Sequence, residues 1–326
     1  MRLVMMGTGL FAEPTLEALL ASSLEVVGLV TQPDRVAGAE RGSTRQTGRG
    51  MKTIAEERGV PVLQPESINT PQGITALQAL KPDLLVVAAY GQILSRDVLA
   101  VSPHGGINVH ASLLPKYRGA APIAWAIYHG ETRTGVTIIK MSTSLDAGDM
   151  LAQEATDIGP DETAGDVEAR LASLGAHQAL QVIEQIQAGT VQGQKQDPSQ
   201  VTKAPKLKKE HGLIDWSRSA GQVCCQVRAM QPWPTAYTFL HRQDQPSFRV
   251  IVNRMGQIAV ASSSAIHPAP GCVLLHEDKS LWVATGANEA VEILELQPAG
   301  KRRMSAKEFL RGNKLKAGDR FGPETP

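Results

Sequence analysis

The sequence has 326 residues, of which 42% are hydrophobic and 20% are charged, and its formal net charge is +1. These values are typical of a soluble globular protein of one to three domains, and no apolar stretch is long enough to cross a membrane. The three cysteines have neither zinc-binding spacing nor a disulfide pattern, and the first residues lead into a strand and not into a signal peptide. We therefore expect a cytoplasmic protein without a membrane anchor.

Residues 1–190 alternate short apolar runs with amphipathic segments. The apolar runs predict β-strands at residues 1–6, 24–31, 84–89 and 135–141 and around Asn108 and His110. The amphipathic segments predict helices at residues 13–22, 51–59, 71–80, 121–129 and 163–189, the last of them ending at Gly189. Continuous Val/Leu runs between helices are typical of strands buried on both faces. The fold class we expect is therefore α/β, an open and mostly parallel Rossmann-like sheet with helices on both faces.

The first predicted strand leads into a glycine turn, Gly7-Thr8-Gly9-Leu10-Phe11-Ala12, and Asp34 follows the second. This pattern fits the dinucleotide-binding fingerprint with alanine in its last place, so an NAD-dependent oxidoreductase is one alternative function. However, small residues at this turn only permit a tight connection, which any open α/β domain can use. Asp34 also lies in a loop and not at a strand tip.

Residues 35–52 form a basic segment that is rich in glycine, serine and threonine and contains a single acid, Glu40. Its cations are Arg35, Arg41, Arg45, Arg49 and Lys52. A solvated loop is the ordinary interpretation of such a segment. At the ligand end of an α/β sheet, a basic loop is also suited to bind phosphates, which is the interpretation we favour.

Three polar side chains have the chemistry that a reaction at a carbonyl carbon requires. Asn108 and His110 stand two residues apart, so on a strand they face the same side. Asp146 follows the next predicted strand, in residues 144–149. The amide can hold developing negative charge on oxygen, the imidazole can handle a proton, and the carboxylate can support the imidazole. No second histidine or cysteine stands at ligand spacing, so we expect no metal.

The sequence changes character after residue 190. Residues 191–206 are polar and without periodicity, and they include Pro198 and Pro205, which predicts a linker. A helix is expected at residues 219–230. Short strands are expected at residues 235–240, 248–253, 257–261, 271–275, 280–285 and 291–296. The domains we expect are therefore 1–190, catalytic, and 207–326, a small OB-like β-barrel of a type often used to bind nucleic acids.

Charge is unevenly distributed between these parts. Residues 1–190 carry 14 Lys/Arg and 20 Asp/Glu, a net charge of −6, whereas residues 191–326 carry 19 and 12, a net charge of +7. The C-terminal part includes Lys206, Lys208 and Lys209 before the barrel and a basic run at residues 301–303. An acidic body joined to a basic domain indicates a polyanionic partner.

The residues 108–115, Asn-Val-His-Ala-Ser-Leu-Leu-Pro, followed by Asp146, resemble the signature of the folate-dependent formyltransferases. Three further features resemble the branch of this family that formylates methionyl-tRNA. They are the basic insertion after residues 32–35, the segment at residues 59–65, and the barrel with residues 214–216 and 228–236. The resemblance extends from the first strand to about residue 322. It departs at Ser144, where relatives tend to carry glycine, so the path of the Asp146 loop is expected to differ.

The resemblance implies transfer of a formyl group from 10-formyltetrahydrofolate to the α-amine of methionine on initiator tRNA, by a monomeric enzyme. It implies that Asn108 donates to the formyl oxygen, that His110 stabilises the oxyanion or relays a proton, and that Asp146 tunes His110. Whether His110 or Asp146 is the general base stays open, because coupled groups titrate together. Another enzyme of 10-formyltetrahydrofolate, a sugar-nucleotide formyltransferase or a hydrolase, also stays open, because those relatives keep the same three residues.

The resemblance also implies binding residues for both substrates. Those implied for folate are Ser112, Leu113, Leu114, Pro115, Val87, Tyr90 and Gly91. Those implied for tRNA are Arg35, Arg41, Arg45, Arg49, Lys206, Lys208 and Lys209.

Overall fold

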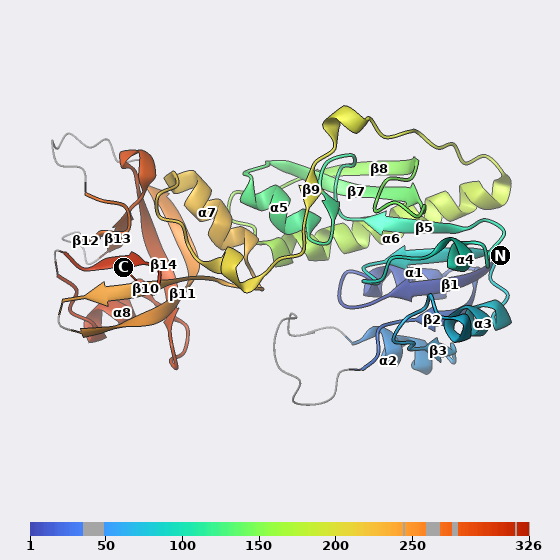
Figure 1. Ribbon diagram of the computed structural model, residues 1–326, viewed down its shortest axis with the longest axis horizontal. Coiled ribbons are helices and arrows are strands. Elements are labelled where there is room, and N and C mark those ends of the chain that lie inside the picture. Colours follow the sequence, from blue (N-terminus) through green and yellow to red (C-terminus); the bar gives the residue numbers. More distant parts are fainter. Residues whose placement is uncertain (35–48, 244, 259–267, 276–279, 317, 326) are drawn as a thin grey trace. The chain divides into compact units, whose positions relative to one another are not determined.

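The computed structural model describes residues 1–34, 49–243, 245–258, 268–275, 280–316 and 318–325, which form two compact units (Figure 1). Unit 1 comprises Met1–Ile123, Arg133–Ile158 and Asp166–Lys206. Unit 2 comprises Ala124–Thr132, Gly159–Gly165 and Leu207–Pro326. The chain thus enters unit 2 twice before the segment that begins at Leu207. None of the described helices has the length and apolar character needed to cross a bilayer.

The sheet of unit 1 has seven strands in the order β3-β2-β1-β4-β5-β7-β8. They are β1 (Arg2–Gly7), β2 (Glu25–Val30), β3 (Val62–Leu63), β4 (Leu84–Ala88), β5 (Gly106–His110), β7 (Arg133–Lys140) and β8 (Met150–Asp157). The strands β1 to β5 are parallel, while β7 and β8 are antiparallel to their neighbours. The mostly parallel sheet expected from the sequence is confirmed.

Strand β8 was not predicted, because its sequence MLAQEATD has no apolar run. Most of its residues are only half-buried, as is typical of a strand at the edge of a sheet. Its place in the structure is determined by hydrogen bonds to β7, between residues such as Gly135 and Ala155. Local sequence preference therefore gives little signal there.

The helices of unit 1 follow the sequence expectations closely. They are α1 (Glu13–Ala21), α2 (Met51–Glu57), α3 (Pro71–Ala79), α4 (Arg96–Leu99), the start of α5 (Pro122–Tyr128), and α6 (Ala164–Ala188). Only the single turn of α4 was not predicted. The helix α6 ends at Ala188, and the next residue, Gly189, has a φ of +69°, a left-handed conformation that favours glycine.

Both faces of the sheet are covered. On one face, Val4, Leu85 and Val87 of β1 and β4 form a buried cluster with Leu77 of α3 and Val98 of α4. Figure 1 shows α6 lying along the part of the sheet that contains β5, β7 and β8.

The helix α6 packs on the opposite face of β5 from Asn108 and His110. A Cβ placed on its Gly175 would lie 2.5 Å from Cγ1 of Val109. Since successive side chains of a strand point to opposite faces, Val109 faces α6 while its two neighbours face away. The sheet thus directs Asn108 and His110 to one side.

The segment at residues 191–206 has more structure than its composition indicates. A short strand in it, β9 (Lys203–Ala204), pairs in parallel with β6 (Arg118–Gly119). The backbone N–H of Tyr117 also donates to Thr202 Oγ1 at 2.8 Å. A one-turn helix, η1 (Pro198–Gln200), lies between these contacts and Gln196. We call residues 191–206 the connector; it belongs to unit 1 and contacts the loop that follows His110.

Unit 2 is built around an antiparallel sheet in the order β12-β13-β14-β11-β10-β16. Its strands are β10 (Ala236–Arg242), β11 (Gln245–Ile258), β12 (Val273–Leu275), β13 (Leu281–Ala284), β14 (Ala290–Pro298) and β16 (Arg320–Gly322), with β15 (Met304–Ser305) beside β14. The two ends of this order meet, because Val273 N–H donates to Asp319 O at 2.9 Å and Phe321 N–H donates to Gly271 O at 2.8 Å. The sheet is therefore closed, as the expected OB-like barrel requires.

The helix predicted at residues 219–230 is α7 (Ala220–Ala229). The strands predicted at residues 248–253 and 257–261 are one long strand, β11, and residues 259–261 lie outside the described part of the chain. The helix α8 (Ala306–Gly312) and the closing strand β16 were not predicted.

Candidate active site

Asn108 and His110 occupy the carboxyl-terminal half of β5, in the middle of the sheet of unit 1. Asn108 is opposite Val87 of β4 in the strand register, and His110 is opposite Thr137 of β7. His110 is only 5% exposed. In the described part of the chain, the side-chain amide of Asn108 has no hydrogen-bonding partner. It is therefore available to a ligand.

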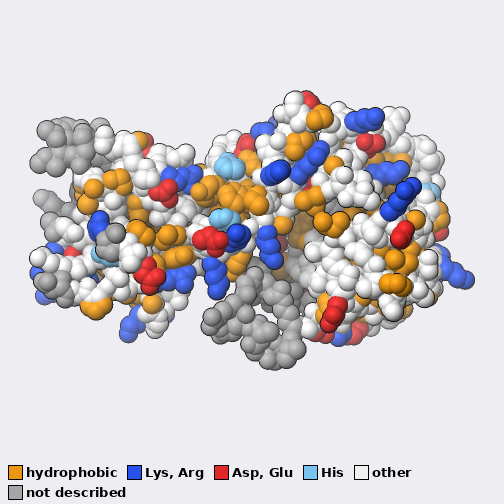
Figure 2. Space-filling model, in the orientation of Figure 1, with side chains coloured by type: hydrophobic (Ala, Val, Ile, Leu, Met, Phe, Trp, Pro, Cys, Tyr) orange, Lys and Arg blue, Asp and Glu red, His pale blue; other side chains and the backbone are white. Residues whose placement is uncertain are grey.

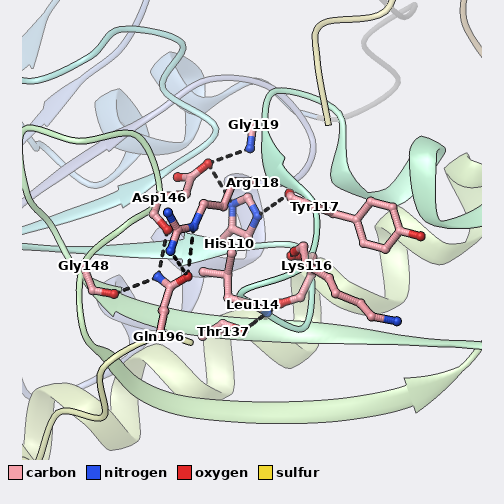
Figure 3. Close-up of polar contacts among 11 residues, drawn as sticks. His110, Leu114, Lys116, Tyr117, Arg118, Gly119, Thr137, Asp146, Gly148 and Gln196 are labelled. Atoms are coloured by element: carbon pink, nitrogen blue, oxygen red, sulfur yellow. Dashed lines mark hydrogen bonds and ion pairs between the residues drawn. The ribbon is translucent and has the colours of Figure 1, made fainter. Parts of the chain in front are cut away.

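Figure 3 shows that the two ring nitrogens of His110 meet different groups. Nε2 lies 3.0 Å from the carbonyl oxygen of Tyr117, and Nδ1 lies 3.6 Å from Oδ2 of Asp146. A carbonyl oxygen can only accept a hydrogen bond, so Nε2 carries the proton and donates it. The neutral ring then presents a bare lone pair at Nδ1 to the carboxylate.

The charge of this imidazole depends on opposing effects. Burial lowers the pKa of His110 below its ordinary value, because a charged ring is poorly solvated in the interior. The Asp146 carboxylate and the hydrogen bond to Tyr117 act in the opposite direction, while the Arg118 guanidinium also lowers the pKa. Burial is the largest of these effects and the net pKa is lowered, so His110 is neutral near pH 7 and can accept a proton at Nδ1.

Asp146 is carried by the loop between β7 and β8. Its side chain is 10% exposed, and Oδ2 accepts a hydrogen bond of 2.8 Å from the backbone N–H of Gly119. The backbone of Asp146 has a φ of +47°, a left-handed conformation that glycine adopts freely and that aspartate tolerates better than most other residues. Gly148 permits this path, because a Cβ there would collide with the carbonyl oxygen of Lys140. Ser144 has no positive φ, so the expected difficulty at that position does not arise.

Two residues that were not predicted from the sequence, Thr137 and Gln153, hold the loop of residues 112–119 in place through hydrogen bonds. Thr137 Oγ1 donates to Ser112 O at 2.7 Å and accepts from Leu114 N–H at 3.1 Å. Gln153 Nε2 donates to Leu114 O and to Thr137 Oγ1, both at 2.9 Å. Thr137 is buried on β7 and Gln153 is exposed on β8, and neither has a local sequence pattern that marks it.

The residues implied for folate occupy two neighbouring segments. Ser112 is fully buried, and its hydroxyl donates to Lys116 O at 2.7 Å, so its side chain supports the loop. Tyr90 is 1% exposed and points into the core cluster, while its carbonyl oxygen accepts from Gln32 Nε2 at 2.9 Å. Only main-chain groups of Tyr90 thus remain near the surface. Gly91 follows with a φ of +82°.

The basic residues implied for tRNA are only partly described. Arg35, Arg41 and Arg45 lie outside the described residues. Arg49 forms ion pairs with Glu17 and Glu57. The others, Lys206, Lys208 and Lys209, are exposed. On the face drawn in Figure 2, Lys and Arg side chains occur on both units.

Unit 1 offers two observations on the glycine turn. A Cβ on Gly7 would lie 2.7 Å from Ala12 Cβ and 2.8 Å from Ala88 O, so glycine is needed for close packing there. Asp34 is held by Lys52 at 2.7 Å and Gln64 at 3.0 Å. The turn therefore has a packing role that requires no dinucleotide. Among the described residues, no three His, Cys, Asp or Glu side chains gather in a way suited to a metal ion.

Comparisons with known proteins give a consistent picture. The family model "Formyl transferase" matches residues 1–183, and "Formyl transferase, C-terminal domain" matches residues 206–314. The methionyl-tRNA formyltransferase of Desulfotalea psychrophila is 44% identical over 317 residues, covering 97% of this chain and 94% of that protein. The methionyl-tRNA formyltransferase of Bacillus subtilis is 41% identical and covers 98% of each chain. The chain belongs to the methionyl-tRNA formyltransferase family.

Solved structures show the same fold in other formyltransferases. One is the N-formyltransferase of Helicobacter canadensis in complex with folinic acid and dTDP-3-aminofucose. Its sequence is 16% identical, and the two structures have a TM-score of 0.63. The match covers 91% of this chain and 98% of that chain. At this identity the likeness concerns the fold alone. The full-length similarity to methionyl-tRNA formyltransferases does not favour the oxidoreductase or the sugar-nucleotide alternative.

Proposed function

We propose that this chain transfers the formyl group of 10-formyltetrahydrofolate to the α-amine of methionine on initiator tRNA. The methionyl-tRNA formyltransferases that match it over nearly their whole length support the acceptor. A folate-derived donor is supported by solved relatives of the same fold, one with folinic acid and one with 5-N-formyl-tetrahydrofolate. The observation that carries the proposal is the contact of His110 Nδ1 with Asp146, beside the unpartnered amide of Asn108.

Each of the three residues has one task in this proposal. Negative charge develops on the formyl oxygen when the amine attacks the formyl carbon, and the Asn108 N–H group donates to that oxygen. The attacking amine has to lose a proton, which His110 Nδ1 and Asp146 Oδ2 accept as a pair. Because Nε2–H already donates to Tyr117, Nδ1 is the ring atom available for this transfer.

The bonds and protons of the proposed reaction balance. The new C–N bond forms to methionine, the bond between the formyl carbon and the folate nitrogen breaks, and the proton held by the pair passes to that nitrogen. Before the reaction, Nδ1 and the carboxylate are two acceptors that face each other, so a proton bound between them stabilises both. The two groups therefore act as the base together, and neither member does so alone.

The remaining residues would bind the two substrates. The loop with Leu113, Leu114 and Pro115 and the backbone around Val87 and Tyr90 would hold the folate. The exposed cations, including Lys206 and Lys209, would hold phosphates of the tRNA. We further propose a cytoplasmic monomer that needs no metal.

The test is an assay with 10-formyltetrahydrofolate and charged initiator tRNA. An amino-sugar nucleotide and water serve as alternative acceptors, and an NAD(H) titration serves as a control. We expect formylation of the tRNA alone. Asn108→Ala should lower kcat about 100- to 1000-fold and His110→Ala about 100- to 10,000-fold. Normal turnover of the His110→Ala variant, or preference for the sugar, would refute the proposal.

A further inference from the structure

We infer that Gln196, in the connector, is a positioning residue that holds the catalytic loop of Asp146 in its reactive place. This inference rests on the function proposed above, because it assumes that Asp146 acts in the reaction. Gln196 lies 50 residues from Asp146 in the sequence, in a stretch whose composition predicts only a linker.

Every polar atom of the Gln196 side chain is used (Figure 3). Nε2 donates to the carbonyl oxygens of Asp146 and Gly148, each at 2.8 Å. Oε1 accepts from Arg118 Nε at 3.0 Å and from Arg118 Nη2 at 2.7 Å. An amide offers two N–H groups and two lone pairs, so this set is complete. The orientation is also unambiguous, since a guanidinium only donates and a carbonyl only accepts.

These contacts close a ring through the active site. Gln196 binds the backbone of Asp146, and the Asp146 carboxylate accepts from the N–H of Gly119. Gly119 follows Arg118 in strand β6, and the Arg118 side chain returns to Gln196. The same strand pairs with β9 of the connector. The two backbones approach closely because Gly119 has no Cβ; a Cβ there would collide with Ala204 O. The connector therefore holds the site at two points.

Asp146 needs such support. Its left-handed backbone is strained for a residue with a Cβ, although aspartate tolerates it better than most residues, so its loop gains from contacts that hold it in place. Without Gln196, the carbonyls of Asp146 and Gly148 lose this side-chain donor, and the loop is free to move. The carboxylate already lies 3.6 Å from His110 Nδ1, so a further displacement of about 1 Å would break the proton-accepting pair.

The experiment measures steady-state kinetics of the full-length protein with three glutamine variants. Gln196→Met keeps the length of the side chain and removes all four hydrogen bonds. Gln196→Glu keeps the acceptor for Arg118 and removes both donors, because an ionised carboxylate only accepts. Gln192→Met is the matched control, since Gln192 is exposed and its side chain has no hydrogen bond within the described residues.

We expect kcat to fall about 10- to 100-fold in both Gln196 variants, with KM for donor and tRNA within about twofold. The control variant should match the unaltered protein. Wild-type kcat in Gln196→Met would overturn the inference. If Gln196→Met does not fold, the Gln196→Glu variant decides, and its full activity would overturn the inference equally.

A double variant separates positioning from general stabilisation. If Gln196 acts through Asp146, then Gln196→Met should change the residual rate of an Asp146→Asn variant by less than about twofold. If the rate losses of Gln196→Met and Asp146→Asn multiply in the double variant, Gln196 acts on the fold and not through Asp146. That result would refute the inference but would leave the proposed function standing. Full activity of Asp146→Asn alone would refute the proposed residue roles and the inference with them.

Discussion

At the scale of single residues, the decisive feature is the direction in which His110 carries its proton. The Tyr117 carbonyl holds that proton on Nε2, on the side away from Asp146. The atom that faces the carboxylate therefore carries no proton, so it can accept a proton but cannot donate one. A histidine whose second nitrogen was free could equally well donate a hydrogen bond to an oxyanion. The sequence leaves two roles open, oxyanion stabilisation and proton relay, and this one backbone carbonyl favours the second.

Nitrogen-15 NMR of the imidazole tests this assignment. At neutral pH, His110 should carry its proton on Nε2 and none on Nδ1. Because burial lowers its pKa, protonation of Nδ1 should occur only as the pH falls below the ordinary value of 6.5. Asp146→Asn removes a charge that raises this pKa, so titration should then move to still lower pH. A higher pKa in that variant would contradict the account.

Tyr90 offers a second test at this scale. Its hydroxyl is buried without a hydrogen-bonding partner among the described residues, and burial raises the pKa of the phenol to about 12. An unpaired buried hydroxyl is unfavourable, so Tyr90→Phe should raise the free energy of unfolding by about 1 kcal/mol. Chemical denaturation measures this change. The KM for the folate donor should stay the same; a large increase would mean that the phenol contacts folate.

At the scale of elements, the strand β5 connects packing to chemistry. Its Val109 packs on α6, and its Asn108 and His110 face the other side of the sheet. A shift of α6 would therefore move both side chains for which we propose a catalytic role. Gly175 is the point of closest approach, since a Cβ there would lie 2.5 Å from Val109 Cγ1.

The variant Gly175→Ala examines this packing. Alanine is preferred over glycine within a helix by about 1 kcal/mol, but overpacking against a stiff valine costs about 1–3 kcal/mol. We expect a net loss of stability of about 1 kcal/mol, together with reduced kcat. Gly312→Ala in α8 is the control, because, apart from its chain neighbours and the backbone of its own helix, no atom of the described residues lies within 4 Å of the added Cβ. It should be neutral or stabilising; equal behaviour of the two variants would contradict this role of α6.

The elements also show what the sequence can predict. Strands such as β1 and β4 are buried on both faces and have apolar sequences, so their pattern alone reveals them. Asn108 and His110 are recognisable because they stand on such a strand at a spacing of two. By contrast, β8 and Gln196 depend on partners distant in the sequence, and neither has a local pattern. Thr137 and Gln153 belong to the same group, since their contacts exist only once β7 and β8 have paired.

At the scale of the whole molecule, the two parts of the sequence carry opposite net charges, and we expect this difference to determine which part attracts tRNA. The net charge of −6 in residues 1–190 disfavours a polyanion, whereas the +7 of residues 191–326 attracts one. Affinity for tRNA should then depend on counterion release. If about four phosphates are contacted, affinity should fall about 100-fold between about 50 and 200 mM salt.

A titration of labelled tRNA at several salt concentrations measures this slope. The KM for the folate donor, which has few charges, provides the comparison and should change much less. Reversal of one cation, for example Lys209→Glu, should weaken tRNA binding and leave the donor KM unaltered. Salt-independent affinity for tRNA would contradict the proposed role of the basic residues.

The connector has a consequence for any attempt to exchange the two units between relatives. Judged by composition, the natural cut falls after residue 190, and everything beyond it would travel with the barrel. Such a chimaera would join the barrel of one protein to a unit 1 that had lost its own Gln196 and β9 and received foreign ones. A recombination point after Lys206 keeps the ring around Asp146 within one parent. The connector should therefore be exchanged together with unit 1, to which it belongs.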